Sequence, residues 1–108
     1  MFTHRQKIKG IIKRFESELI KLNIKPQKII LFGSYANGKP REDSDIDIVV
    51  ISEDFRNLNL RERLEILGLA AGRVLEPIEA LGYTPEEAKS ANPVSILNEV
   101  LTSGITIA

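Results

Sequence analysis

The chain has 108 residues, of which 43% are hydrophobic and 28% are charged, the composition of an ordinary globular protein with one core. It contains no cysteine and one histidine, His4, so thiolate metal sites and disulfides are excluded and histidine-triad or zinc catalysis is not expected. The net charge is zero, but residues 1–41 hold ten of the fifteen Lys and Arg residues and two of the fifteen acids. This basic half is either a solvated helix face or an attraction for phosphates or an acidic partner.

The first half of the chain predicts one helix followed by two strands. Apolar residues recur every three or four positions over residues 3–23, which indicates an amphipathic helix, and Pro26 follows its end. The apolar runs at 28–32 and about 45–52 indicate buried strands. Between them we expect a short helical turn at 34–37 and a polar loop at 39–44.

The second half predicts further helices and two short strands. Asn59 and Glu62 have the spacing of a capping box, and a helix is expected to follow them. We also expect a strand at 77–83, a helix beginning after Thr84, a helix from 92 to about 102, and a terminal strand at 105–107. The apolar side chains that the helix after Asn59 is expected to bury are Leu60, Leu64, Leu67, Ala71 and Val74.

This order of elements predicts an α/β or α+β fold in which a small mixed β-sheet is flanked by helices. No apolar stretch approaches 18 residues and no signal peptide is visible, so we expect a single cytoplasmic domain over residues 1–108. The short terminal strand leaves open a homo-oligomer formed by pairing at an exposed edge.

The most informative pattern is a Gly33-Ser34 pair followed, after ten residues, by Asp45 and Asp47. Side chains two apart in a strand share one face, about 6.5–7 Å apart along the backbone, so both carboxylates converge on one point. Like charges at that spacing need a cation, and hard divalent ions prefer oxygen ligands. The Gly-Ser turn offers backbone N–H groups and a hydroxyl to a phosphate. The pattern therefore indicates metal-dependent nucleotide chemistry.

Two other motifs resemble this segment without matching it. Residues 33–39 follow the P-loop spacing, but Pro40 stands where the magnesium-binding hydroxyl belongs. The acids at 43, 45, 47 and 54 imitate a calcium loop, but its required glycine is Ile48 in an apolar run. A purely structural role for the acids is also disfavoured, because Asp47 interrupts a buried strand and an unpaired buried carboxylate costs several kcal/mol.

Taken together, the Gly33-Ser34 turn and the Asp45-Ile46-Asp47 strand closely resemble the minimal nucleotidyltransferases of the DNA polymerase β-like superfamily. The resemblance covers most of the chain and implies a fold like the polymerase β palm. It also implies transfer of AMP from ATP to an acceptor hydroxyl with a two-metal Mg²⁺ site.

The resemblance assigns roles to individual residues. Asp45 and Asp47 would be catalytic and bind the metals, and Gly33 and Ser34 would hold the triphosphate. The third catalytic and metal-binding carboxylate would be Glu79, since Glu76 lies three positions earlier and would face the other side of a regular strand.

One position departs from the family pattern. Asn37 stands where relatives often carry arginine, so Lys39 or Arg41 would supply the charge that binds the nucleotide. Both residues are otherwise ordinary members of a solvated loop.

The resemblance also implies a partner. Such proteins are typically antitoxins paired with a HEPN-type helical toxin, in some systems through AMP transfer to a toxin tyrosine. Two alternatives stay open: an antitoxin or scaffold that acts by binding alone, and a transferase that acts on a small molecule or RNA.

Overall fold

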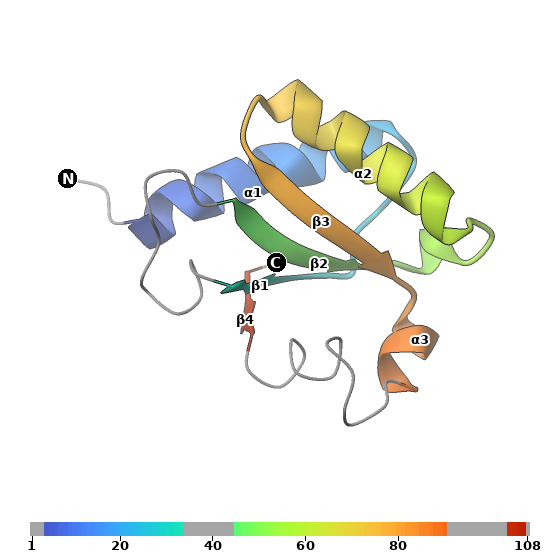
Figure 1. The fold of residues 1–108 in the computed structure, drawn as a ribbon. Coiled ribbons are helices and arrows are strands. Elements are labelled where there is room, and N and C mark those ends of the chain that lie inside the picture. Colours follow the sequence, from blue (N-terminus) through green and yellow to red (C-terminus); the bar gives the residue numbers. More distant parts are fainter. Residues whose placement is uncertain (1–3, 34–44, 91–103, 108) are drawn as a thin grey trace.

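The structure is a computed structural model that describes residues 4–33, 45–90 and 104–107. The α-helices and β-strands of the described residues follow the order that the sequence predicts (Figure 1). In chain order they are α1 (His4–Lys21), β1 (Lys28–Phe32), β2 (Ile46–Ile51), the 3-10 helix η2 (Glu53–Phe55), α2 (Leu60–Val74), β3 (Ile78–Tyr83), α3 (Pro85–Lys89) and β4 (Ile105–Thr106).

The four strands form one sheet in the order β3-β2-β1-β4. β1 is antiparallel to both β2 and β4, whereas β2 and β3 are parallel. The parallel pair needs a crossover connection, and α2 supplies it. The mixed sheet with helices is confirmed, and the terminal strand pairs with β1 of the same chain.

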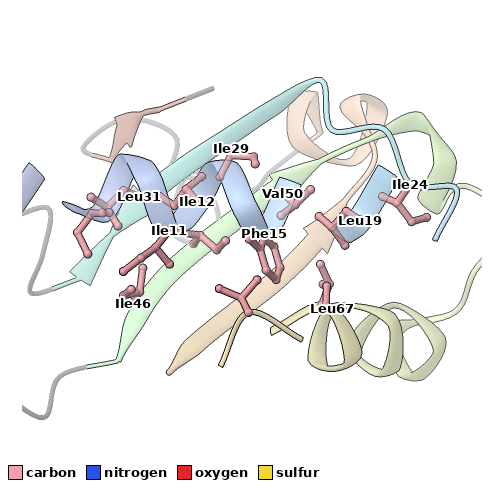
Figure 2. Packing of buried hydrophobic residues seen from close by; sticks show 14 of the residues in the cluster. Ile11, Ile12, Phe15, Leu19, Ile24, Ile29, Leu31, Ile46, Val50 and Leu67 are labelled. Atoms are coloured by element: carbon pink, nitrogen blue, oxygen red, sulfur yellow. The ribbon is translucent and has the colours of Figure 1, made fainter. Parts of the chain in front are cut away.

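One face of the sheet packs against α1 and α2 and holds the main core (Figure 1). Phe15 and Leu19 of α1 are fully buried there. Ile46 and Val50 of β2 and Leu67 of α2 complete the layer, as Figure 2 shows. We call this the helix face.

The opposite face carries a smaller cluster of Ile30, Val49 and Ile51, with Leu81 and Tyr83 of β3 packed against it. Successive side chains of a strand alternate between the faces, so the odd-numbered residues of β2 and β3 belong here. The two acids within these strands, at positions 47 and 79, therefore lie on this face. We call it the site face.

The local signals for helix ends are confirmed. Asn59 caps α2 and forms the capping box with Glu62, and Thr84 caps α3 with Pro85 in the first turn. The turn expected at 34–37, the loop at 39–44 and the helix at 92–102 lie outside the described residues. None of the described helices is long and apolar enough to cross a membrane.

The buried stripe of α2 differs from the expected one. Leu67 and Val74 are buried as predicted, but Leu60 is 61% exposed and Leu64 is 44% exposed, so their predicted burial is wrong. Arg63 is buried instead, with its guanidinium donating to backbone oxygens of Leu58, Phe55 and Gly82. These hydrogen bonds satisfy a buried cation.

Candidate functional site

The candidate site is centred on Asp47 of β2, one of the two middle strands of the sheet. The strand register pairs Asp47 with Phe32 of β1 on one side and with Glu79 of β3 on the other. Asp45 is exposed and comes directly before β2. Residues that are distant in sequence thus meet on the site face: Gly33 follows Phe32 on one side of Asp47, and Glu79 lies on the other.

Gly33 approaches the Asp47 carboxylate closely. Its φ is +75°, a backbone conformation that favours glycine. A Cβ at this position would overlap an Asp47 carboxylate oxygen. The first residue of the predicted phosphate-binding turn therefore lies directly against the Asp47 carboxylate. Ser34, Lys39 and Arg41, the other predicted nucleotide-binding residues, lie outside the described residues.

The three predicted metal-binding acids influence one another. Burial raises the pKa of Asp47 above its usual value, and the charge of Asp45 adds to this, while hydrogen bonding with Glu79 opposes it. Hydrogen bonding with Asp47 raises the pKa of Glu79 in turn, followed by the charges of Asp45 and Asp47. The charge of Asp45 thus disfavours ionisation of both Asp47 and Glu79, and the proton of this cluster is favoured on Glu79, which hydrogen-bonds with Asp47.

The donor set suits a hard divalent cation such as Mg²⁺, because it consists of carboxylate oxygens whose repulsion an ion would relieve. In the described parts of the chain, no group of three or more His, Asp or Glu side chains is already arranged to hold an ion. Asp45, Asp47 and Glu79 are the side chains that would gather around one.

Glu76, the alternative to Glu79, lies elsewhere. It precedes β3 and its carboxylate is 3.6 Å from the Arg14 guanidinium of α1. The β2–β3 register places Glu79 next to Asp47, and Glu76 outside this register.

A cavity of about 450 Å³ adjoins the acids. It extends from Asp47 and Glu79 around β3 to α2, where Leu64 and Gly68 line it. Its lining is mostly apolar, and the remaining residues are Phe32, Leu67, Ile78, Ala80 and Leu81. Sequence reasoning missed this cavity because it assigned Leu64 to the core. The apolar residues Leu67, Ala70 and Val74 form the buried stripe of α2, but its first position is Arg63, so hydrophobicity alone did not show that Leu64 and Gly68 lie beside this stripe.

Comparison with known proteins identifies the family. Residues 8–100 match the family of the nucleotidyltransferase domain. The chain is 30% identical over 98 residues to Putative protein adenylyltransferase MJ0141 of Methanocaldococcus jannaschii, an alignment that covers 90% of this chain and 95% of that protein.

Two crystal structures have a similar fold over 93% of this chain and 72% of theirs, each with a TM-score of 0.62. One, at 30% identity, is a toxin–antitoxin with AMP-PNP. The other, at 26% identity, is a toxin–antitoxin MntA–HpeT mutant in which two aspartates two positions apart are changed to glutamate. The sheet, the helices and the match over residues 8–100 agree, and the chain therefore belongs to the nucleotidyltransferase domain family as a relative of the minimal, MntA-like nucleotidyltransferases.

Proposed function

We propose that this nucleotidyltransferase transfers AMP from ATP to a tyrosine hydroxyl of a partner HEPN-type toxin in the cytoplasm, and so acts as its antitoxin. The observation that carries the proposal is the register that sets Glu79 opposite Asp47, with Gly33 on the other side. The similar toxin–antitoxin structures support the kind of partner, and the AMP-PNP in one of them supports a nucleoside triphosphate as donor.

In this proposal, one set of residues binds the triphosphate and another binds the metal. The N–H groups of the Gly33-Ser34 turn and the Ser34 hydroxyl hold the triphosphate, and Lys39 or Arg41 neutralises its charge. Asp45, Asp47 and Glu79 hold Mg²⁺, which when bound stabilises the charges that develop on the entering and leaving oxygens. Positioning and charge stabilisation are what phosphoryl transfer chiefly requires, and a chain without cysteine can supply both.

The transfer itself balances as a single displacement. The acceptor hydroxyl oxygen forms a bond to the α-phosphorus while the bond from that phosphorus to the bridging oxygen of the β-phosphate breaks. Pyrophosphate leaves with the electron pair, and the hydroxyl proton passes to a carboxylate on the site face or to water. Glu79, on the β3 side of Asp47, is the carboxylate that we assign to orient the hydroxyl.

A non-catalytic antitoxin, which neutralises its partner by binding alone, is the second candidate. Asn37 favours it, since asparagine cannot supply the phosphate-neutralising charge of the arginine that relatives often carry there. Both candidates share the toxin partner and differ in whether AMP is transferred to it.

The deciding experiment uses ATP labelled at the α-phosphate, Mg²⁺ and the purified product of the neighbouring gene. We expect label on that protein with the wild-type chain and none with Asp47→Asn, although both chains bind the partner. Complex formation without any label transfer would contradict the enzymatic proposal and support neutralisation by binding. Label on RNA or a small molecule would instead identify a different acceptor.

A further inference from the structure

Within the part of the chain that the structure describes, β3 presents a free edge beside the site. It ends the strand order β3-β2-β1-β4 among the described residues. The carbonyl oxygens of Pro77 and Tyr83 accept hydrogen bonds from the backbone N–H groups of Ile46 and Ser52. The odd-numbered residues of β3 therefore direct their backbone N–H and C=O groups toward β2. Those of the even-numbered residues, Ala80 among them, point to the free edge. Ala80, in the middle of β3, thus directs both its backbone donor and its backbone acceptor to this edge.

The far end of this edge is closed by a side chain. Arg63 of α2 donates a hydrogen bond of 3.1 Å to the carbonyl oxygen of Gly82, which has the same outward orientation as Ala80. The guanidinium is fixed there by Glu87 and by the carbonyl oxygen of Phe55. The N–H of Ile78 already donates to the carbonyl oxygen of Glu76. The open part of the edge is therefore the stretch of its first half from the Ile78 carbonyl to the backbone groups of Ala80, next to Glu79.

The cavity described above follows this open part around both faces of β3. On the site face it reaches Asp47 and Glu79, and on the helix face it reaches Leu64 and Gly68. A strand sends successive side chains to opposite faces, so a strand added at this edge would fill both halves of the cavity with neighbouring side chains. A compact small molecule would occupy only one half.

We propose that the acceptor polypeptide binds as an added strand along the first half of the β3 edge, beside Ala80. Its hydroxyl-bearing side chain points to Asp47 and Glu79, and the apolar side chain next to it enters the cavity beside Leu64 and Gly68. The inference rests on the proposed function and adds to it the form in which the acceptor is recognised: an extended segment with an apolar neighbour to the hydroxyl residue.

The position of the cavity agrees with the direction of the displacement. The Gly33 turn follows β1, on one side of Asp47, and the cavity lies toward β3, on the other side. An in-line displacement needs the entering hydroxyl and the leaving pyrophosphate on opposite sides of the phosphorus. With the triphosphate held at the Gly33 turn, the hydroxyl must come from the β3 side, where the edge and the cavity are open.

Two glycines of α2 provide a matched pair of variants. Gly68 lines the cavity and Gly72 does not, and a Cβ at either position meets no atom within 4 Å. Leucine is a better helix former than glycine, so both Gly68→Leu and Gly72→Leu are expected to fold. The leucine at position 68 fills the helix-face half of the cavity, whereas the leucine at position 72 leaves it open.

The experiment measures transfer of label from ATP, labelled at the α-phosphate, to two probes. One is a short peptide with a central tyrosine flanked by valines and terminal lysines, and the other is N-acetyl-tyrosinamide. We expect kcat/KM for the peptide to exceed that for the amide by at least about tenfold, since the edge hydrogen bonds and the apolar contact are absent from the amide. Gly68→Leu should remove this advantage of the peptide over the amide, while Gly72→Leu behaves as wild type with both probes.

A second set of peptides tests the strand geometry. Alternate amides of an added strand face its neighbour, so N-methylation of one alternate set should suppress transfer and N-methylation of the other set should be tolerated. Equal transfer to peptide and amide, or equal effects of Gly68→Leu and Gly72→Leu, would overturn the inference while leaving AMP transfer intact. Absence of label on both probes with the wild-type chain would contradict the proposed function and the inference together.

Discussion

The carboxylate of Asp47 occupies the space that a side chain on residue 33 would need. Gly33 combines this close approach with a φ of +75°. Glycine at this position therefore serves two purposes: it turns the chain after β1, and it leaves room for the acid at the centre of the site. Comparing a substitution at Gly33 with one at a helical glycine tests whether this turn and this close approach are required.

Gly33→Ala should destabilise the protein and impair nucleotide transfer. The left-handed conformation costs a residue with a Cβ about 1–2 kcal/mol, and the overlap must also displace the Asp47 carboxylate. Urea unfolding measures the loss of stability. Gly10→Ala, in the middle of α1 with no atom within 4 Å of the new Cβ, is the control and should stabilise by about 0.5–1 kcal/mol. A neutral Gly33→Ala would show that this close approach is not required.

Asp47→Asn should stabilise the metal-free protein and abolish AMP transfer. The substitution removes a partly buried charge that lies beside two other carboxylates, so thermal unfolding without Mg²⁺ should occur at a higher temperature. Addition of Mg²⁺ should raise the unfolding temperature of the wild type and leave that of the variant unchanged. Transfer should fall by at least about 10²-fold, as for other preorganised charge-stabilising groups.

Glu79→Gln and Glu76→Gln test which acid completes the site. Glu79 is the register partner of Asp47, whereas Glu76 contacts Arg14 through a partly exposed 3.6 Å ion pair. We expect Glu79→Gln to lower both the Mg²⁺ response and transfer, and Glu76→Gln to change neither. The reverse outcome, measured by the same thermal and label-transfer assays, would move the third carboxylate to position 76.

Arg63→Met should be among the most destabilising substitutions on α2. The guanidinium donates to the backbone oxygens of Leu58, Phe55 and Gly82, and methionine can replace none of these hydrogen bonds. A buried acceptor that loses its donor typically costs about 1–3 kcal/mol, and the remaining Glu87 carboxylate is half-exposed and stays solvated. Urea unfolding of Arg61→Met gives the control. Arg61 is exposed and forms a surface ion pair with Glu65, so its loss should cost under about 0.5 kcal/mol.

Glu87 should make folding stability sensitive to acid. Partial burial raises the pKa of Glu87, but the hydrogen bonds donated by Arg63 and Thr84 outweigh it and hold the pKa below its usual 4.5. The stability that this carboxylate contributes is complete above pH 4.5 and is lost as the pH falls through the lowered pKa. Glu87→Gln should therefore give a shallower loss of stability below pH 4.5, measured by urea unfolding from pH 7 to pH 3. An identical slope in both proteins would contradict this linkage.

The elements themselves could be predicted because their signals are local. The capping box of Asn59 and Glu62, the Thr84 cap and the apolar runs of the strands all act within a few residues, and the structure confirms them. The importance of Asp47 is also visible locally, since a carboxylate in a buried apolar strand requires a partner.

What the sequence by itself determined is the set of helices and strands, the family resemblance and the acid-bearing strand, because each depends on neighbours in the chain. Only the tertiary structure decided that Glu79 meets Asp47, that Arg63 replaces Leu64 in the core, and that the cavity opens at the β3 edge. These outcomes depend on the register and packing of segments about thirty residues apart, which arise from long-range contacts and leave no pattern within either segment alone.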